Sequence, residues 1–350
     1  MQNPAVVKQF GAKILGIYSG AILTKLIEIG YQTGLFEASK HGPASAEELS
    51  ERAGLRERYV REWLGAMTTS GIYSYDAASK RYTLPEDHAA LLSGDTAQNL
   101  SPMSRMINHF GTHLPKLIAC FREGGGVPYS AYRPVFTQCM DDVWRRIYDQ
   151  QLISGFIASV QGLTTALERG IRVLDVGCGT GHAINLLARQ YPKSSFHGYD
   201  IAEDAIAGAR GEAKEMALKN AAFDVQDVTN LPGSTQFELI TAFDAIHDQK
   251  APDAVLRGIN RLLAPDGTFL MIEFKFSSRV EENLGNPFAT MYYGISLMHC
   301  MTVSLAVGGP GLGAVWGEQT ARRMLSEAGF SKIKVVDTPR PQNCIFVCGH

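Results

Sequence analysis

Three glycines at alternate positions, Gly177, Gly179 and Gly181, follow an apolar run that ends in Asp175 and Val176. Glycine lets a backbone turn tightly and approach a ligand closely, because it has no Cβ. The spacing G-x-G-x-G differs from the dinucleotide fingerprint and from the P-loop, and no lysine follows to hold a phosphate. Asp175 would repel a phosphate but can accept hydrogen bonds from an ammonium or hydroxyl group. The motif therefore predicts a binding site for a cationic ligand.

Two more carboxylates end the next predicted strands. Asp200 closes the run 195–200, and Asp227 follows the run 222–225. An acid at the tip of the second strand of an open parallel sheet accepts hydrogen bonds from ribose hydroxyls. The ligand that we predict from these positions therefore carries a ribose as well as a positive charge.

A histidine with the chemistry of a general base follows the predicted fourth strand, residues 237–243. It lies in the run Phe243-Asp-Ala-Ile-His247-Asp248. With an ordinary pKa near 6.5, histidine can remove the proton of a phenol, for a rate gain of order 10²–10⁴. A lone histidine is more often structural than catalytic. Its place after a strand, on the edge where ligands bind, is what favours chemistry.

Taken in order, these segments resemble the class I S-adenosylmethionine-dependent methyltransferases. The resemblance implies that the glycine loop with Asp175 holds S-adenosyl-L-methionine as cofactor, that Asp200 binds its ribose, and that Asp227 accepts from its adenine amino group. Further cofactor contacts implied by the resemblance are Ile201, Val228 and Phe243.

The pair His247-Asp248 resembles that of small-molecule O-methyltransferases of the plant caffeic-acid type and their bacterial relatives. That resemblance implies that His247 is the general base and that two glutamates, Glu273 and Glu318, orient it. Gln249 stands where a tryptophan often follows in the family, so acceptor-pocket residues cannot be transferred. We expect no metal, because Asp244 and Asp248 alone are too few for a site.

The predicted strands and helices that must position these side chains indicate an α/β fold. We expect a Rossmann-like, seven-stranded methyltransferase sheet of order 3-2-1-4-5-7-6 in a domain over residues 166–350. A lid insertion at about 275–315 is rich in Met, Tyr and Gly. Such a stripe is most often core, but its place after a strand end favours a lid over an apolar substrate.

The first 95 residues predict a mainly helical winged-helix domain, followed by a helical connection over 96–165. Ser45 and Glu48 form a capping box that opens a short helix, and a second helix and a hairpin follow. The second helix carries Arg58 and Arg61, but Glu57 and Glu62 interrupt its basic face, so nucleic acid is not the expected partner. This segment resembles the dimerisation domain of the same O-methyltransferases, so we expect a homodimer.

Composition sets the broad class. The chain has 350 residues, a net charge of -2, 45% hydrophobic and 19% charged residues, which is typical of a globular protein of two domains. No signal peptide is recognisable, and we expect no apolar run near the roughly 20 residues of a membrane span. The six cysteines are scattered and are expected to be reduced. We therefore expect a cytoplasmic protein that does not bind a membrane.

The leading interpretation is a cytoplasmic, homodimeric methyltransferase that uses S-adenosyl-L-methionine to methylate an oxygen of a small, largely apolar, aromatic molecule. An N-, S- or C-methyltransferase remains an alternative, in which His247 would matter less. A second alternative is a metabolite-sensing regulator whose winged helix binds DNA. A third is a protein that binds the cofactor but catalyses a reaction other than methylation.

Overall fold

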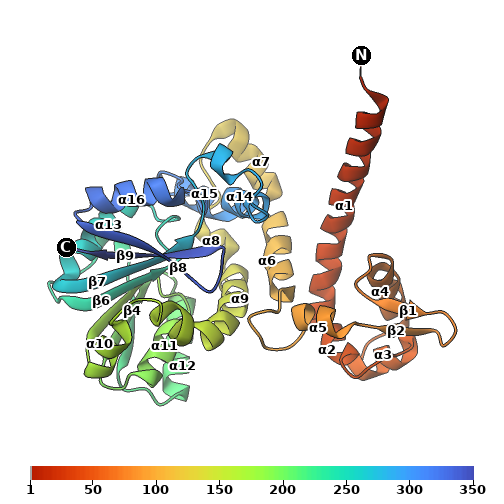
Figure 1. Ribbon diagram of the computed structural model, residues 1–350, viewed down its shortest axis with the longest axis horizontal. Coiled ribbons are helices and arrows are strands. Elements are labelled where there is room, and N and C mark those ends of the chain that lie inside the picture. The colour runs from red at the N-terminus through yellow and green to blue at the C-terminus, as the bar shows by residue number, and fades with distance from the viewer. Residues whose placement is uncertain (1) are drawn as a thin grey trace. The chain divides into compact units, whose positions relative to one another are not determined.

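The computed structural model describes residues 2–350, which form two compact units that meet in sequence between His109 and Phe110. Figure 1 labels their elements. Each unit has its own core.

The N-terminal unit begins with one long helix, α1 (Pro4–Gln32). Asn3 caps it by accepting from the backbone N–H of Ala5 at 3.1 Å. Only the last turns of α1 pack on the rest of the unit. There the Trp63 indole N–H donates to the Leu26 carbonyl at 2.8 Å, and a Cβ on Gly30 would lie 2.6 Å from the Phe36 ring.

The rest of this unit contains the predicted winged helix. The capping box is present, because Ser45 Oγ accepts from Glu48 N and Glu48 Oε2 accepts from Ser45 N. Leu49, Leu64 and Met67 lie in its buried core. The elements are α2 (Leu35–Ser39), α3 (Ala46–Ala53), α4 (Glu57–Thr69), β1 (Ser74–Asp76), β2 (Arg81–Thr83), α5 (Glu86–Leu92) and α6 (Ser101–Gly111), the last of which runs past the boundary.

Helix α1 corrects the expectation about apolar runs. Within the described residues it is the one helix long and apolar enough, by length and composition, to cross a membrane. The reason is that Lys8 and Lys13 both lie early, so that the stretch after them contains only Lys25 and Glu28 as charges. A helix of this kind near an N-terminus is weak evidence for a membrane span, since core helices and signal sequences pass the same test.

The C-terminal unit is built on a seven-stranded sheet of order β5-β4-β3-β6-β7-β9-β8. Counted from β3, this is the predicted order 3-2-1-4-5-7-6, which is confirmed. All pairs are parallel except those of β9, which runs antiparallel to both neighbours. The strands are β3 (Arg172–Val176), β4 (Ser195–Asp200), β5 (Ala221–Val225), β6 (Phe237–Phe243), β7 (Leu263–Phe274), β8 (Lys332–Asp337) and β9 (Asn343–Gly349).

Helices cover both faces of this sheet. In Figure 1, α11 and α12 lie against one face and α13 and α16 against the other. Val255, Leu256 and Ile259 of α13 are fully buried against strand residues such as Leu174 and Ile240. These helices are α10 (Leu163–Arg169), α11 (His182–Gln190), α12 (Glu203–Glu215), α13 (Pro252–Leu262) and α16 (Gly317–Glu327), with a 3-10 turn η2 (Val228–Asn230) before β6.

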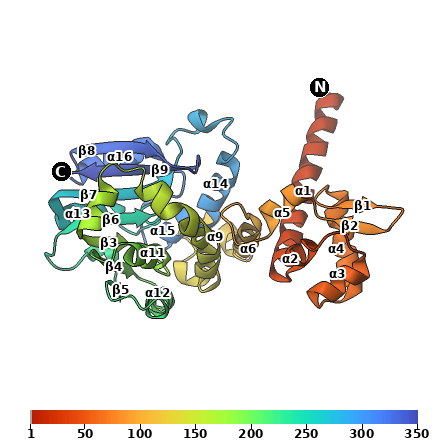
Figure 2. The ribbon, with the colours of Figure 1, turned by 60° about the horizontal axis from the view of Figure 1, so that its bottom comes forward.

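A further group of helices lies beyond the carboxyl ends of the strands, as Figures 1 and 2 show for α9, α14 and α15. Ring contacts fix this end, because Tyr148 meets Phe243 at the tip of β6 and Tyr292 meets Phe274 at the tip of β7. The group comprises α7 (Leu114–Glu123), α8 (Tyr129–Tyr132), α9 (Val135–Gln151), η1 (Leu152–Ile157), η3 (Val280–Asn283), α14 (Ala289–Ile295), η4 (Ser296–Cys300) and α15 (Met301–Ala306).

The insertion between β7 and α16 begins and ends at neighbouring points. Ser278 Oγ donates to the Trp316 carbonyl at 2.6 Å and accepts from Thr320 N at 3.0 Å. A Cβ on Gly317 would lie 2.1 Å from the Ser278 nitrogen, so only glycine fits this crossing. The chain between these points holds η3, α14, η4 and α15, and it is the segment that the sequence analysis interpreted as a lid.

Candidate active site

The glycine-rich loop joins β3 to α11 and takes its shape from three left-handed glycines, with φ values of 78°, 54° and 72° at Gly177, Gly179 and Gly181. A Cβ on Gly177 would lie 2.6 Å from the Ala245 Cβ, and one on Gly181 would lie 2.6 Å from Ala209 and Phe223 side-chain atoms. Around the Cβ position of Gly179, by contrast, no atom lies within 4 Å. The two outer glycines therefore pack inside the protein, and the central one leaves its backbone open to a ligand.

Asp200 sits at the tip of β4, where it faces this loop. Its Oδ2 accepts from Gly179 N at 2.9 Å and its Oδ1 from Ala202 N at 2.8 Å. A carboxylate has about four acceptor positions, so both oxygens can still receive hydroxyl groups. Burial raises the pKa of Asp200 above its ordinary value, against the effect of these backbone bonds.

Asp175 lies one strand away, at the end of β3, and is 2% exposed. The Thr241 hydroxyl of β6 donates to its Oδ1 at 2.6 Å. Burial raises the pKa of this carboxyl to about 7, although the Thr241 bond opposes the rise. A negative charge here costs free energy in the absence of a positive partner, so the position suits a ligand that brings a cation.

The remaining predicted cofactor residues follow the neighbouring strands. Asp227 is exposed and its Oδ1 caps η2, accepting from the backbone N–H and the hydroxyl of Thr229 at 2.9 and 2.7 Å. Ile201 follows Asp200 and is 58% exposed, whereas Val228 is buried. The Phe243 ring meets the Tyr148 ring of α9 edge-on, with centroids 5.4 Å apart.

His247 and Glu273 form a buried pair at the ends of β6 and β7. The imidazole Nδ1 lies 2.7 Å from Glu273 Oε2, and the two side chains are 2% and 1% exposed. The Trp316 indole N–H reaches the same carboxylate oxygen at 3.3 Å. Because Nδ1 faces Glu273, Nε2 is the nitrogen that can exchange a proton with a substrate.

The surroundings of His247 favour its charged form. Burial disfavours the imidazolium, but the Glu273 carboxylate and the Cys300 thiol outweigh burial and hold the pKa of His247 well above its ordinary value. The ligand-free site therefore favours a protonated His247 at neutral pH. It can act as a base only after it has lost that proton.

Glu318 does not take the place expected of it. It is the first-turn acid of α16, and its Oε1 accepts from Arg322, one turn further along the helix, at 2.7 Å. Its side chain is 42% exposed, whereas His247 is buried. The second group that contacts Glu273 is Trp316, two residues earlier. Its indole was missed because nothing in the sequence pairs a tryptophan with a strand-end glutamate.

Asp244 is a second residue that the sequence analysis left without a role. It has φ of 50°, a conformation that non-glycine residues adopt at functional sites more often than elsewhere. Neither of its buried carboxylate oxygens has a hydrogen bond within the described residues, and burial raises its pKa well above the ordinary value. Burial likewise raises the pKa of Asp248 to about 6. Within residues 2–350 no group of three or more acidic, His or Cys side chains could hold a metal ion.

An apolar wall stands beside His247. The Phe274 ring lies 5.9 Å from the imidazole and 4.4 Å from the Tyr292 ring, which in turn lies 5.3 Å from Phe276. Phe288 and Met291 of the insertion pack on the same cluster. The surroundings of the histidine are therefore largely aromatic.

A surface hollow of about 580 Å³ is found elsewhere on the unit. Arg172, Ser195, Ala221 and Phe237, the first residues of their strands, line it. It lies at the amino ends of β3, β4, β5 and β6, opposite the glycine-rich loop. Ligands of open parallel sheets bind at the carboxyl ends, so this hollow is not the donor site.

The sheet and the glycine-rich loop lie in a segment that matches a known protein family. Residues 167–329 match the family described as "Methyltransferase domain", and residues 21–94 match the "Rv2258c-like winged HTH domain". The chain has a methyltransferase domain. A winged helix-turn-helix domain precedes it.

Curated relatives match mainly the methyltransferase domain. The malonyl-[acyl-carrier protein] O-methyltransferase of Bacillus cereus is 31% identical over 104 residues, which are 30% of this chain and 38% of the relative. The mitochondrial ubiquinone biosynthesis O-methyltransferase of Candida albicans is 26% identical over 139 residues, 39% of this chain and 40% of the relative. The chain thus spans about two fifths of the length of these relatives.

Solved structures match the whole chain. A putative O-methyltransferase from Nostoc punctiforme has a TM-score of 0.75 at 19% identity, with 99% of both chains covered. The mitomycin 7-O-methyltransferase MmcR has the same TM-score at 16% identity, covering 99% of this chain and 100% of its own. Human N-acetylserotonin methyltransferase, solved with S-adenosyl-L-methionine, has a TM-score of 0.69 at 17% identity, with 100% and 99% covered. At these sequence identities the similarity is one of fold. The shared fold is that of S-adenosyl-L-methionine-dependent methyltransferases.

Proposed function

We propose that this protein transfers a methyl group from S-adenosyl-L-methionine to an oxygen of a small, largely apolar, aromatic acceptor, with His247 as the general base. The observation that carries the proposal is the buried His247–Glu273 pair, with 2.7 Å between Nδ1 and Oε2, at the same sheet edge as the glycine-rich loop. In this arrangement a proton acceptor stands near a site suited to a cation.

The donor residues fit their proposed ligand on structural grounds. Gly179 leaves open space for a close backbone contact, Asp200 retains acceptor capacity for two ribose hydroxyls, and Asp175 is a buried carboxylate short of a positive partner. Asp227 is exposed for a contact with an adenine amino group, and Ile201, Val228 and Phe243 are the further proposed cofactor contacts. When bound, S-adenosyl-L-methionine supplies an electrophilic methyl group on sulfur.

The protein's own contribution to the transfer is alignment and proton removal. His247 Nε2 would take the proton of the acceptor hydroxyl, so that the oxygen can accept the methyl group. Glu273 then stabilises the imidazolium that forms, and Trp316 fixes the position of the Glu273 carboxylate. The aromatic wall of Phe274, Tyr292 and Phe276 supports an apolar, planar acceptor.

Calorimetric titration tests the donor site first. S-adenosyl-L-methionine and its demethylated product should bind the wild-type protein at micromolar concentrations, and Asp200→Ala should lose both. Transfer of a labelled methyl group to a panel of phenols then tests the acceptor class. His247→Ala should abolish transfer while leaving donor affinity nearly unchanged. Full activity of that variant would show that His247 is not the general base. Transfer only to amines, thiols or carbon acids would favour the N-, S- or C-methyltransferase alternative.

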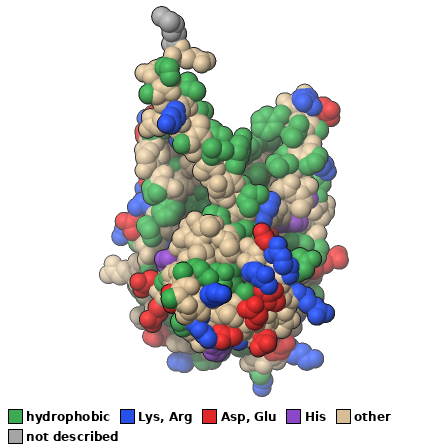
Figure 3. Space-filling view, turned by 90° about the vertical axis from the view of Figure 1, so that its right-hand side faces the viewer, with side chains coloured by type: hydrophobic (Ala, Val, Ile, Leu, Met, Phe, Trp, Pro, Cys, Tyr) green, Lys and Arg blue, Asp and Glu red, His purple; other side chains and the backbone are tan. Residues whose placement is uncertain are grey.

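We further propose that the active protein is a homodimer in the cytoplasm and that α1 carries the interface. Val7, Phe10, Leu15 and Ile17 of this helix are all more than half exposed, and Figure 3 shows hydrophobic side chains along it. Such a long apolar surface is unusual for a helix that stays in water. Sedimentation should give twice the mass of the chain.

The six cysteines are free thiols, which fits the proposed cytoplasmic location, because the cytoplasm is a reducing compartment.

The match to a winged helix-turn-helix domain supports a regulator that binds DNA as the second candidate. Ion pairs on α4 weigh against it. Arg61 pairs with Glu57 at 2.5 Å and Arg58 with Glu62 at 2.6 Å, and Figure 3 shows acidic and basic side chains interspersed on this unit. Both of these arginines therefore already have a carboxylate partner. A specific DNA complex with a steep salt dependence would reverse this ranking.

A further inference from the structure

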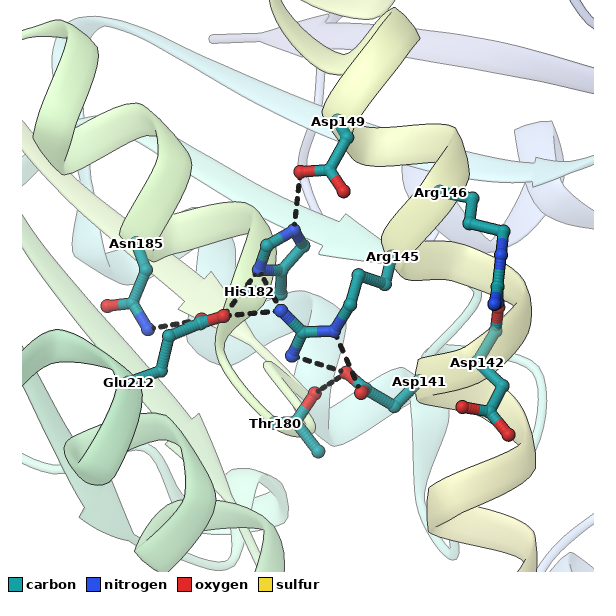
Figure 4. A network of polar contacts seen from close by, with 9 residues as sticks. All are labelled: Asp141, Asp142, Arg145, Arg146, Asp149, Thr180, His182, Asn185 and Glu212. Carbon is teal, nitrogen blue, oxygen red and sulfur yellow. Dashed lines mark hydrogen bonds and ion pairs between the residues drawn. The ribbon is translucent and has the colours of Figure 1, made fainter. Parts of the chain in front are cut away.

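Helix α9 is bonded to the glycine-rich loop by a network of charged side chains, drawn in Figure 4. The hydroxyl of Thr180, which lies between the second and third glycines, donates to Asp141 Oδ1 at 2.6 Å. Asp141 belongs to the first half of α9, 39 residues earlier in the chain. This bond ties the loop to a helix outside the sheet.

Arg145, one turn further along α9, holds Asp141 in place. Its Nε and Nη2 donate to the two oxygens of Asp141, each at 3.0 Å, which is the bidentate geometry of a strong ion pair. Its Nη1 also donates to Glu212 of α12 and lies 2.8 Å from His182 Nδ1. Arg145 thus joins three elements around the loop.

His182, the first residue of α11, completes the network from the other side. The ring is 5% exposed, and its Nε2 lies 2.9 Å from Asp149 near the end of α9. Glu212 also accepts from the Asn185 amide at 2.7 Å. Burial works against the charge of Glu212, but the bonds from His182, Arg145 and Asn185 prevail and lower its pKa to about 2.

The same helix also contacts the end of β6. The Tyr148 ring stacks on Trp144 with centroids 5.3 Å apart and meets Phe243 at the tip of β6. These two rings lie on either side of Arg145 in the sequence of the same helix. A displacement of α9 would therefore disturb the glycine-rich loop and the wall beside Phe243 together.

We propose that Asp141 and Arg145 are positioning residues for the methyl donor, and that α9 must be docked on the loop for the donor to stay bound. This inference rests on the proposed function, because it assumes that the glycine-rich loop binds S-adenosyl-L-methionine. Coupling between sites is reciprocal. If docking of α9 strengthens donor binding, bound donor strengthens the docking of α9 by the same factor.

The test uses the full chain and S-adenosylhomocysteine, the demethylated product, as the probe. Thr180→Val removes the hydroxyl bond to Asp141 and keeps the size of the side chain. Its dissociation constant for the probe should rise about tenfold, within the roughly 5- to 150-fold range typical of coupled sites. Arg145→Met should weaken binding at least as much, and Thr180→Val should add little to it, because both changes act through the position of Asp141.

Glu238→Gln is the matched control. Glu238 accepts from Arg172 at 2.8 Å, so this ion pair lies at the first residue of β3, at the other end of the strand from the loop. Both pairs are partly exposed. The control should bind the probe as the wild type does, whatever small loss of thermal stability it shows.

Hydrogen exchange supplies a readout that a merely structural role would not change. Amides of α9 should gain protection when the wild type binds the probe, and they should gain much less in Thr180→Val at saturating probe. The inference would be overturned if Thr180→Val bound the probe as tightly as the wild type and the probe did not change hydrogen exchange in α9. The proposed function would still stand. A wild-type protein that does not bind the probe would instead overturn the proposed function, and this inference with it.

Discussion

Replacing Asp175 with Asn should make the ligand-free protein more stable and its donor binding weaker. The carboxyl is 2% exposed, and its pKa is raised to about 7 from 3.8 by burial. Between these two pH values the folded protein keeps a proton that the unfolded chain releases. Stability therefore falls as the pH rises through this window, and above pH 7 the loss is complete.

The magnitude follows from the two pKa values. They differ by about 3 pH units, and each unit corresponds to ~1.36 kcal/mol, so the charged carboxylate costs at most about 4 kcal/mol of the free energy of unfolding at pH 8. Asn removes that charge and can still accept from the Thr241 hydroxyl, which now donates to Oδ1 at 2.6 Å. A gain of ~1 kcal/mol already raises the Tm of a domain of this size by roughly 2–4 °C.

The assay is thermal unfolding of the ligand-free protein at pH 5 and pH 8, followed by titration with S-adenosyl-L-methionine. Asp175→Asn should raise the Tm more at pH 8 than at pH 5, and it should weaken donor binding. Asp253→Asn is a control of opposite sign, because a bond from Arg257 lowers the pKa of Asp253, so this variant should lose stability at pH 8. Equal Tm values for Asp175→Asn and the wild type at both pH values would refute the reasoning.

Three more predictions follow from other parts of the structure. Gly181→Ala should fail to fold or lose much thermal stability, because its Cβ would lie 2.6 Å from two side chains. Gly179→Ala has open space around its Cβ and adds only the backbone strain of alanine at a φ of 54°, so it should fold and lose donor affinity, and calorimetry separates the two variants. Glu273→Gln should lower the maximal rate and move the acidic limb of the pH–rate profile to lower pH, because the carboxylate that raises the pKa of His247 is gone; an unmoved limb would show that His247 does not titrate in the reaction. Ile17→Glu places a charge on the exposed face of α1 and should shift the protein from dimer to monomer in sedimentation, whereas an unchanged mass would exclude α1 from the interface.

The sheet order and the place of the donor loop could be predicted because their signals are local. A glycine triplet after an apolar run, and acids at the ends of the next strands, each occupy a few consecutive residues. The order of seven strands then followed from the resemblance that these segments carry. His247 and Glu273 were predicted in the same way, and the structure places them 2.7 Å apart.

What the sequence could not give are contacts between side chains far apart in the chain. Arg145 and Glu212 are 67 residues apart and Trp316 and Glu273 are 43 apart, and no periodicity links them. Glu318 was assigned to His247 by its place before a helix, but a first-turn glutamate with an arginine four residues later pairs along its own helix.

The insertion after β7 has a consequence for how this protein can change over evolutionary time. Its two ends meet where Ser278 holds Trp316 and Thr320, and Gly317 allows the close crossing. The sheet is therefore joined to the same two anchor points whatever segment lies between them. Lengthening a surface loop whose ends are held together costs little conformational entropy. Segments exchanged between those anchors would alter the aromatic wall and leave the His247–Glu273 pair in register. New acceptors can be acquired in this way without rebuilding the chemistry.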